Sequence, residues 1–209
     1  MPVDSQTQRN ENRGSGGSDV SQAEQGRDLA QEGMRRSSEA DLLLLARLGG
    51  ELVRIRTMRK LSQASLGAMT RLHVNTISSV ERGRTDPSIF VLGLICLGLG
   101  CPRIELSDEG LFPVMGSDAG LPPYALRSLF RKPGAMAAHS AGFSMLRASS
   151  GMSIRGLAAS AGVHPNTVWN YETGRTAPSV TVAFRIYLEL GIRSIGGSGD
   201  IRTDRHNTL

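Results

Sequence analysis

Apolar residues along the chain recur in short blocks at the spacing of an α-helix, and polar breaks separate the blocks. The first series predicts four successive short helices, of which the third carries Ile77 and Val80 on one buried face. Ser62 stands where the second helix begins, and its side-chain oxygen is suited to accept a hydrogen bond from a free amide there. Gly83 is expected to end the third helix in the left-handed conformation, and Pro87 to keep it from resuming.

The same pattern returns 91 residues further along the chain, so the sequence contains an internal repeat. Ten of nineteen positions are identical between residues 73–91 and 164–182. Matches extend outward to Arg56/Arg147 on one side and to Ile104/Ile195 on the other. Two copies are too few for a solenoid, which needs at least three units to bury a continuous core. The repeat therefore predicts two small domains in tandem.

The boundaries of these domains follow from shifts in composition. Residues 1–37 are polar and poor in aliphatic side chains, so we expect a disordered segment. Residues 38–105 form the first domain with a leading helix (copy one), and residues 135–195 form the second domain (copy two). Residues 106–134 are expected to be a linker, and residues 196–209 a flexible tail. An extended linker of this length does not forbid both domains from reaching neighbouring major grooves of DNA.

The leading helix contains four consecutive leucines, Leu42 to Leu45, which is more apolar surface than one helix face needs. Two alternatives remain open for this surface. It packs on the first domain, or it forms a contact in a homodimer.

Positive charge is concentrated in the two repeats. Residues 48–105 carry eight basic and four acidic side chains, and residues 143–195 carry five and two. This distribution is compatible with a nucleic-acid partner. Cys96 and Cys101 form no CxxC pair, which argues against a disulfide framework or a zinc site and fits a reducing cytosol. The first residues lack the apolar segment of a signal peptide, and every apolar run is too short to cross a bilayer, so we expect no membrane association.

Two short helices, a break of about four residues and a third helix form the helix-turn-helix pattern. The stretches LSQASLGAMTRLHVNTISSVERGRTDPS and MSIRGLAASAGVHPNTVWNYETGRTAPS resemble the Cro/lambda-repressor-like (Xre) DNA-binding family. The resemblance implies an all-α fold of two tandem lambda-repressor-like domains. It also implies a sequence-specific binder of double-stranded DNA that regulates transcription in the cytoplasm, at the nucleoid, without a cofactor. Most members of the family act as repressors.

The resemblance also assigns roles to residues in both copies. The residues expected to contact bases are Val74, Asn75, Ser78 and Ser79 in copy one and Pro165, Asn166, Trp169 and Asn170 in copy two. The residues expected to contact phosphate are Gln63, Arg71, His73 and Arg84 in copy one and Arg155, His164 and Arg175 in copy two. Two family ion pairs that join the first helix to the end of the third correspond to Arg56 with Glu81 and to Arg147 with Glu172.

Some of these roles have a plainer alternative. Asn75 and Asn166 are suited to bond adenine N6 and N7 together, at about 1–3 kcal/mol of discrimination, or they are simply solvated. Trp169 covers an apolar base edge or packs against the neighbouring helix. Arg71 stands where the family usually has glycine, which predicts a distorted turn or a phosphate contact. Ile154 stands in copy two where copy one has Gln63, and Arg155 is adjacent to it.

Other functions compete with a two-headed DNA reader. In one alternative, one domain binds DNA and the other contacts RNA polymerase or another protein, as in an activator, an antitoxin or a phage or plasmid control protein. An enzyme is disfavoured, because the sequence has no nucleophile–base set and no phosphate-binding GxxxxGK[ST] loop. His73 and His164 lack the acidic or cysteine neighbours of a metal site, and helix capping or phosphate contact is a simpler use for them.

Overall fold

The computed structural model describes residues 39–116, 135–196 and 201–203. Residues 41–209 belong to one compact unit, which contains both copies of the repeat. The disordered segment predicted for residues 1–37 and most of the predicted linker lie outside the described residues.

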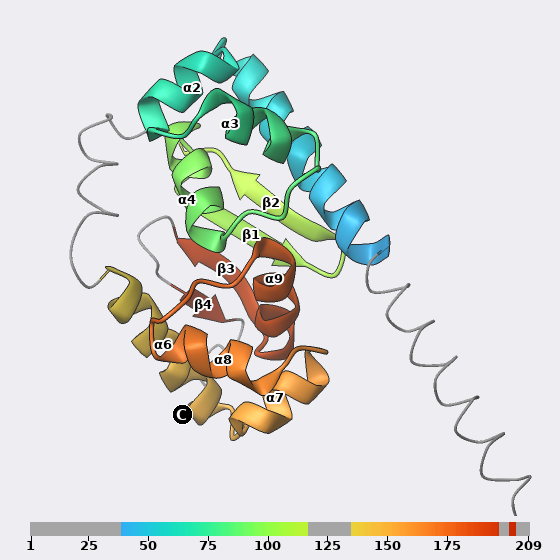
Figure 1. The fold of residues 1–209 in the computed structure, drawn as a ribbon, viewed down its shortest axis with the longest axis vertical. Helices are drawn as coiled ribbons and strands as arrows, with labels where there is room; N and C mark the ends of the chain where they lie inside the picture. The colour runs from blue at the N-terminus through green and yellow to red at the C-terminus, as the bar shows by residue number, and fades with distance from the viewer. Residues whose placement is uncertain (1–38, 117–134, 197–200, 204–209) are drawn as a thin grey trace, which may run out of the picture. The chain divides into compact units, whose positions relative to one another are not determined.

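Copy one consists of a leading helix and three short helices whose starts are capped by side chains. Ser62 accepts a hydrogen bond from the amide of Ser65 at 2.9 Å, which confirms its predicted capping role. Gly83, at a φ of 63°, follows the third helix in the left-handed conformation that glycine adopts at low cost. The helices are the leading helix (residues 39–58), α2 (Gln63–Thr70), α3 (Val74–Glu81) and α4 (Ile89–Gly98) (Figure 1).

Copy two repeats this order of helices. Ser153 caps its second helix by accepting from the amide of Gly156 at 2.9 Å, and Pro165 occupies the first turn of its third helix, where proline is tolerated. The core of copy two is aromatic where that of copy one is aliphatic, because Phe143 packs on Tyr171 and Tyr187. The helices are α6 (Ala135–Ser149), α7 (Ile154–Ser160), α8 (Pro165–Glu172) and α9 (Val180–Glu189).

A four-stranded antiparallel sheet joins the two copies, with the strands in the order β2-β1-β3-β4 (Figure 1). The strands are β1 (Arg103–Ser107), β2 (Gly110–Val114), β3 (Ile192–Gly196) and β4 (Ile201–Thr203). The chain is thus mostly helical, as expected, but the prediction of an all-α fold is wrong in this part. The beginning of the predicted linker forms the end of β1 and all of β2, and part of the predicted tail forms β4. Strands this short carry little periodic signal of their own, and β1 and β3 exist as a pair only because the two copies meet.

The pairing of β1 with β3 follows a two-fold relation between the copies. Ile104 lies opposite Ile195, and these two residues are equivalent in the repeat. On either side, Arg103 lies opposite Gly196 and Glu105 lies opposite Ser194. Exchanging the copies turns the first of these pairs into the second. The copies therefore face each other like the subunits of a symmetric dimer, within one chain.

A second set of contacts obeys the same two-fold relation. Ser88 forms an antiparallel bridge with its equivalent, Ser179. The amide of Ile89 donates to the carbonyl of Pro178 at 3.0 Å, and the amide of Val180 donates to the carbonyl of Pro87 at 2.8 Å. The repeated Pro-Ser pair therefore lies at the junction of the two copies.

One contact at this junction breaks the symmetry. The carboxylate of Asp86 accepts from the hydroxyl of Thr181 at 2.6 Å and from the Thr181 amide at 3.2 Å. Ala177 and Phe90 occupy the equivalent positions and cannot form this pair. The junction is thus asymmetric at this contact.

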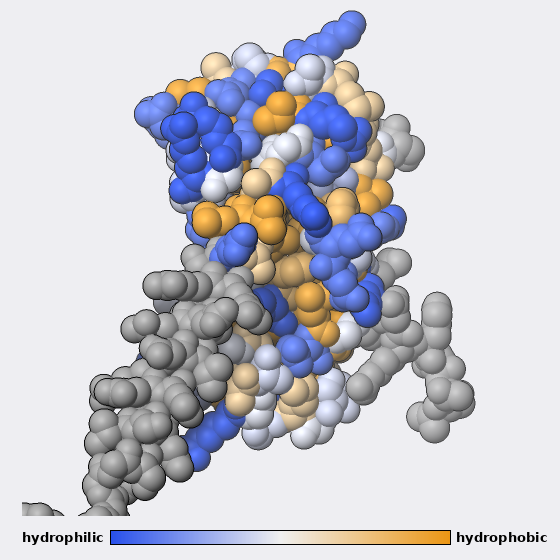
Figure 2. All heavy atoms as spheres, turned by 90° about the vertical axis from the view of Figure 1, so that its right-hand side faces the viewer, coloured by the Kyte–Doolittle hydropathy of each residue, from blue (hydrophilic) through white to orange (hydrophobic). Residues whose placement is uncertain are grey.

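A continuous hydrophobic core runs through both copies, and α4 contacts α9 across the junction. Leu44 and Leu45 of the leading helix are buried in this core, so the helix packs on the body of the protein. Leu42 and Leu43 remain 59% and 56% exposed. Figure 2 shows hydrophilic and hydrophobic side chains intermixed over the described part of one face. None of the helices in the described ranges has the length and apolar character needed to span a bilayer.

Candidate nucleic-acid interface

The third helix of each copy presents the same polar residue to solvent. Asn75 on α3 and Asn166 on α8 lie one residue after the start of their helices, and both are exposed. The expected base-contacting side chains of α3 are exposed at Val74 and half-buried at Ser78 and Ser79. Those of α8 are exposed at Trp169 and half-buried at Pro165 and Asn170. Each helix thus brings its expected residues together on one partly solvent-accessible stretch.

Both α3 and α8 begin at a histidine cap. Nδ1 of His73 accepts from the amide of Asn75 at 3.2 Å, and Nδ1 of His164 accepts from the amide of Asn166 at 3.1 Å. A neutral imidazole that accepts at Nδ1 carries its proton on Nε2. Both rings therefore keep an N–H donor for an external acceptor, so capping and phosphate contact are compatible.

A buried ion pair fixes the end of α3, and another the end of α8, to the helix that begins the same copy. In copy one, Arg56 Nε lies 2.5 Å from Glu81 Oε1, and the Arg56 guanidinium also donates to the carbonyl of Leu61 at 2.8 Å. The hydrogen bond that Arg56 donates to Glu81 raises the pKa of Arg56 above its ordinary value. The charged guanidinium therefore holds the helix end by charge-assisted hydrogen bonds.

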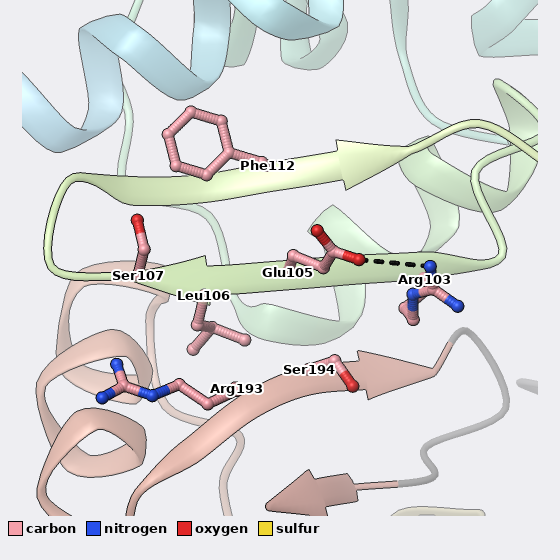
Figure 3. Close-up of a pocket in the computed structure, with 7 residues that line it drawn as sticks. All are labelled: Arg103, Glu105, Leu106, Ser107, Phe112, Arg193 and Ser194. Carbon is pink, nitrogen blue, oxygen red and sulfur yellow. Dashed lines mark hydrogen bonds and ion pairs between the residues drawn. The ribbon is translucent and has the colours of Figure 1, made fainter. Parts of the chain in front are cut away.

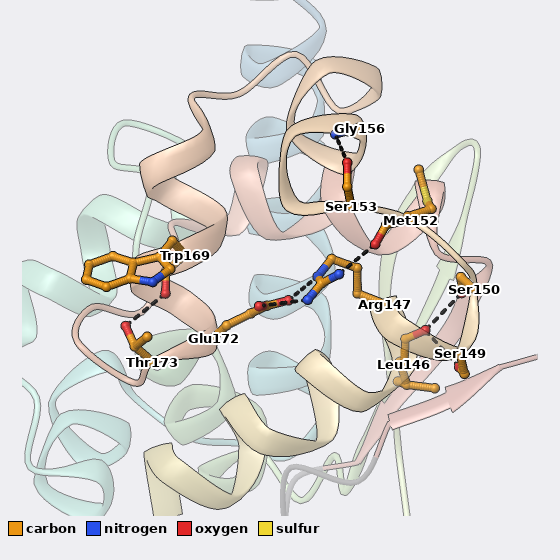
Figure 4. A network of polar contacts seen from close by, with 10 residues as sticks. All are labelled: Leu146, Arg147, Ser149, Ser150, Met152, Ser153, Gly156, Trp169, Glu172 and Thr173. Atoms are coloured by element: carbon orange, nitrogen blue, oxygen red, sulfur yellow. Dashed lines mark hydrogen bonds and ion pairs between the residues drawn. The ribbon is translucent and has the colours of Figure 1, made fainter.

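In copy two, Arg147 pairs with Glu172 in the same way and donates to the carbonyl of Met152 at 2.6 Å (Figure 4). The copies differ in the other hydrogen-bond donors to the glutamate of the pair. Gln63 Nε2 donates to Glu81 Oε2 at 2.6 Å, whereas Ile154 stands at the equivalent position and cannot donate. The bond uses one of the two Gln63 amide hydrogens, and the other remains for a second acceptor.

Two basic residues of copy one occupy the left-handed backbone region. Lys60 has a φ of 55° and Arg71 a φ of 59°, and both are exposed. Their equivalents in copy two are Gly151 and Gly162, with φ values of 69° and 62°. The backbone turns of the two copies are therefore alike, and copy one carries cations where copy two carries glycine.

Trp169 lies on the surface of α8, 39% exposed, and not in the core. The guanidinium carbon of Arg175 lies 4.3 Å from the centroid of its ring. With Ile154, Arg155 and Pro165, Trp169 lines a shallow hollow that Asn166 also borders. Ile154 and Arg155 belong to α7, so this side chain borders a neighbouring helix and also reaches solvent. In copy one Ser78 takes its place, and Arg84, the equivalent of Arg175, is also exposed.

The helix-turn-helix family model matches residues 52–106 and again residues 144–194. The two matched segments cover half of the chain and coincide with the two copies of the repeat. The chain belongs to the Cro/C1-type helix-turn-helix family. No curated protein and no solved structure matches the chain in the same comparisons. The family comprises DNA-binding regulators of transcription, and α3 and α8 occupy the position of the recognition helix in the two copies of this helix-turn-helix protein.

A second hollow lies over the sheet of the helix-turn-helix protein, away from the recognition helices (Figure 3). Its basic residues face acidic partners: Arg103 lies 3.1 Å from Glu105, and Arg193 lies 3.7 Å from Asp108. Among the described residues, no group of three or more His, Cys, Asp and Glu side chains is placed to hold a metal ion. The residues lining the hollow are Arg103, Glu105, Leu106, Ser107, Phe112, Arg193 and Ser194.

The two cysteines of this helix-turn-helix protein are free and buried. Burial raises the pKa of Cys101 to about 11, and burial also raises the pKa of Cys96 well above its ordinary value. Both thiols therefore stay protonated at neutral pH and pack as small apolar side chains.

The contacts between the copies are the part of the site that sequence reasoning missed. The identity of Pro87-Ser88 with Pro178-Ser179 was an available signal, but the exit of the recognition helix explained it equally well. The match of Ile104 with Ile195 was a second signal, at the far end of the repeat. The Asp86–Thr181 contact had no such signal, because its two positions differ between the copies.

Proposed function

We propose that the protein is a sequence-specific repressor of transcription that reads double-stranded DNA with both of its helix-turn-helix copies. The observation that carries this proposal is the pair of exposed asparagines, Asn75 and Asn166, each at the histidine-capped start of a recognition helix. An asparagine in a major groove can donate to adenine N7 and accept from adenine N6 at once. Two such residues at equivalent places give one chain two base-reading positions.

The surroundings of each asparagine suit the phosphates that flank a major groove. In copy one these are the Nε2–H of His73, the free amide hydrogen of Gln63, and the exposed guanidinium groups of Arg71 and Arg84. In copy two these are the Nε2–H of His164 and the exposed guanidinium groups of Arg155 and Arg175. Such contacts position a protein on the duplex, and the bases then specify the sequence. The remaining expected base contacts are the side chains of Val74, Ser78, Ser79, Pro165, Trp169 and Asn170.

Repression follows from occupancy, because a protein that covers a promoter needs no further contact to exclude the polymerase. Activation would require an additional surface for RNA polymerase. The exposed side chains of Leu42 and Leu43 on the leading helix would serve such a contact, or a contact with a second chain.

The alternative is that copy one binds DNA and copy two binds protein. It is favoured by two differences in copy two: Ile154 replaces the polar Gln63, and the exposed Trp169 replaces Ser78. Tryptophan is enriched in protein interfaces, where it is a frequent hot spot. The two functions make opposite statements about Asn166, so a single substitution separates them.

The experiment selects bound duplexes from random DNA with the full-length protein and then measures the affinity of single variants. Asn75→Ala and Asn166→Ala are each expected to weaken specific binding by 1–3 kcal/mol, which is roughly 5- to 150-fold, and to relax sequence preference at one position. Glu189→Ala, an exposed polar change at the end of α9, is the control and should have no effect. Unchanged specific binding by Asn166→Ala would contradict two-headed reading. Binding that does not weaken with salt would contradict the phosphate contacts themselves.

A further inference from the structure

We infer that one chain is a complete reader of an inverted, imperfect repeat in DNA, with a single permitted spacing between its two half-sites. This inference rests on the proposed function and adds the arrangement of the target and the number of chains that bind it. It is carried by the two-fold relation between the copies and by the contact that breaks that relation.

The orientation of the half-sites follows from the symmetry of the strand pairing. Ile104 faces its own equivalent, Ile195, and the flanking pairs exchange when the copies are exchanged. Such a relation turns one recognition helix into the other by rotation about an axis. The local dyad of duplex DNA relates inverted half-sites in the same way, and two-fold proteins bind pseudo-palindromes for this reason. To bind a direct repeat, the two copies would have to be related by a translation along the DNA. They are related by a rotation instead.

The fixed spacing follows from the kind of contact between the copies. The two copies share one sheet through β1 and β3 and one hydrophobic core. They are also joined by the backbone hydrogen bonds of Ile89 and Val180. Moving one copy by half a helical turn of DNA relative to the other would break all of these contacts. The distance between the half-sites is therefore set by the junction and not by the reach of the segment that connects the copies.

The repeat is imperfect because the recognition helices share only part of their surface. Asn75 and Asn166 are common to both, but Ser78 corresponds to Trp169 and Ser79 to Asn170. We therefore expect one base pair in common between the half-sites and different neighbours around it. A perfect palindrome of either half-site would satisfy only one head.

One chain suffices because the junction prefers copy one against copy two. In a pair of two copy-one domains, Asp86 would lie opposite Phe90, which has no hydroxyl to replace the Thr181 hydroxyl bond at 2.6 Å. In a pair of two copy-two domains, Ala177 would lie opposite Thr181. Within one chain the correct partner is also held at high effective concentration.

The test uses the full-length protein and duplexes built from its selected half-sites in three arrangements. The first is the native inverted repeat, the second the same repeat with five base pairs inserted at the centre, and the third a direct repeat. We expect one chain per native duplex by native mass spectrometry or sedimentation. We expect affinities for the other two duplexes to fall to that of a single half-site. Two chains per native duplex, or equal affinity for the direct repeat, would overturn the inference.

These outcomes remain distinct from a failure of the proposed function. A protein that binds a single half-site with sequence preference, but tolerates every arrangement, keeps its function and loses the fixed geometry. A protein with no sequence preference for duplex DNA loses both.

A variant of the junction checks the cause of the spacing. Asp86→Ala installs the residue that copy two has at this position and leaves the recognition helices untouched. The affinity ratio between the native and the lengthened duplex should fall by roughly tenfold, as for the loss of hydrogen bonds to a charged group, with unchanged affinity for a single half-site. A drop in half-site affinity with an unchanged ratio would contradict the role of the junction.

Discussion

Arg175 lies over the exposed ring of Trp169, with 4.3 Å between its guanidinium carbon and the ring centroid. The stacked cation holds the ring at the surface of α8, beside the hollow that Ile154 and Pro165 line. Copy two therefore presents an apolar surface, the Trp169 ring, next to the positive charge of Arg175. The 5-methyl group of thymine is the apolar feature that the major groove offers.

We therefore predict that copy two distinguishes thymine from deoxyuridine more strongly than copy one does. Replacing one thymine of the copy-two half-site by deoxyuridine should weaken binding about threefold to fivefold, as expected for about 0.8 kcal/mol per buried methyl. The measurement is a scan of deoxyuridine substitutions across the selected duplex. Trp169→Ser, which installs the residue of copy one, should abolish the difference.

The thymines of the copy-one half-site are the internal control for this scan. Ser78 stands there in place of Trp169, so their methyl groups should matter less. Equal sensitivity in both half-sites, or sensitivity that survives Trp169→Ser, would show that the hollow does not contact the base.

The left-handed residues of copy one give a prediction in which stability and binding change in opposite directions. A side chain in this region costs roughly 1–2 kcal/mol, and glycine gives back about 0.5–1 kcal/mol of that through its entropy in the unfolded chain. Arg71→Gly and Lys60→Gly should therefore each stabilise the protein by about 0.5–1 kcal/mol in urea unfolding. Arg71→Gly should also weaken DNA binding and reduce the slope of log K against log salt by about 0.9.

Gly162→Arg is the matched change in copy two. Space near this glycine is open, because the nearest heavy atom to an added Cβ is Arg185 Nη1 at 4.0 Å. The substitution should destabilise the protein by about 1 kcal/mol through backbone strain alone. If Arg71→Gly stabilises the fold and leaves the salt slope unchanged, the cation is not a phosphate contact.

The helices and their order within each copy could be predicted from sequence, because each helix carries its own signals. Ser62 and Ser153 cap, and Gly83 and Gly174 end the third helices, at the positions that local chemistry predicts. The sheet could not be predicted. Its central register joins Ile104 to Ile195, and residues this far apart in sequence have no local rule that pairs them.

The candidate site, like the fold, could be predicted from sequence only in part. The ion pairs of Arg56 with Glu81 and of Arg147 with Glu172 follow family positions, and the structure contains both. The position of Trp169 could not be decided from sequence, since a large aromatic on a short helix fits a core and a surface equally well. Arg175 lies six residues further along the chain, and its contact with the Trp169 ring becomes visible only in the folded structure.

The ion pairs predict unequal costs for the same substitution in the two copies. The side chain of Glu81 is 2% exposed and serves both Arg56 and Gln63, whereas that of Glu172 is 8% exposed and faces Arg147 without an equivalent glutamine. Removing one member of a buried pair costs about 3–5 kcal/mol, because the other charge is left uncompensated. Glu81→Gln should therefore lie at the upper end of this range and Glu172→Gln at the lower end, measured by chemical unfolding.

Gln63→Ile separates the two contributions, since it installs the copy-two residue and keeps the ion pair. It should cost about 1.5–3 kcal/mol, the value for a hydrogen bond to a charged group. Equal costs for Glu81→Gln and Glu172→Gln would show that the glutamine adds nothing to the hold on the recognition helix.

The facing isoleucines at the centre of the junction predict that the two copies unfold as one. Ile104 and Ile195 are each 5% exposed and lie directly opposite each other across β1 and β3. Ile104→Ala and Ile195→Ala should each destabilise the protein by about 2–5 kcal/mol. Because they share one cross-strand contact, the double variant should depart from additivity by about 0.5–3 kcal/mol. Chemical unfolding followed by Trp169 fluorescence, which reports on copy two, should shift for Ile104→Ala as much as for Ile195→Ala. Additive costs, or a Trp169 transition unmoved by Ile104→Ala, would mean that the copies are independent domains and that β1 and β3 do not couple them.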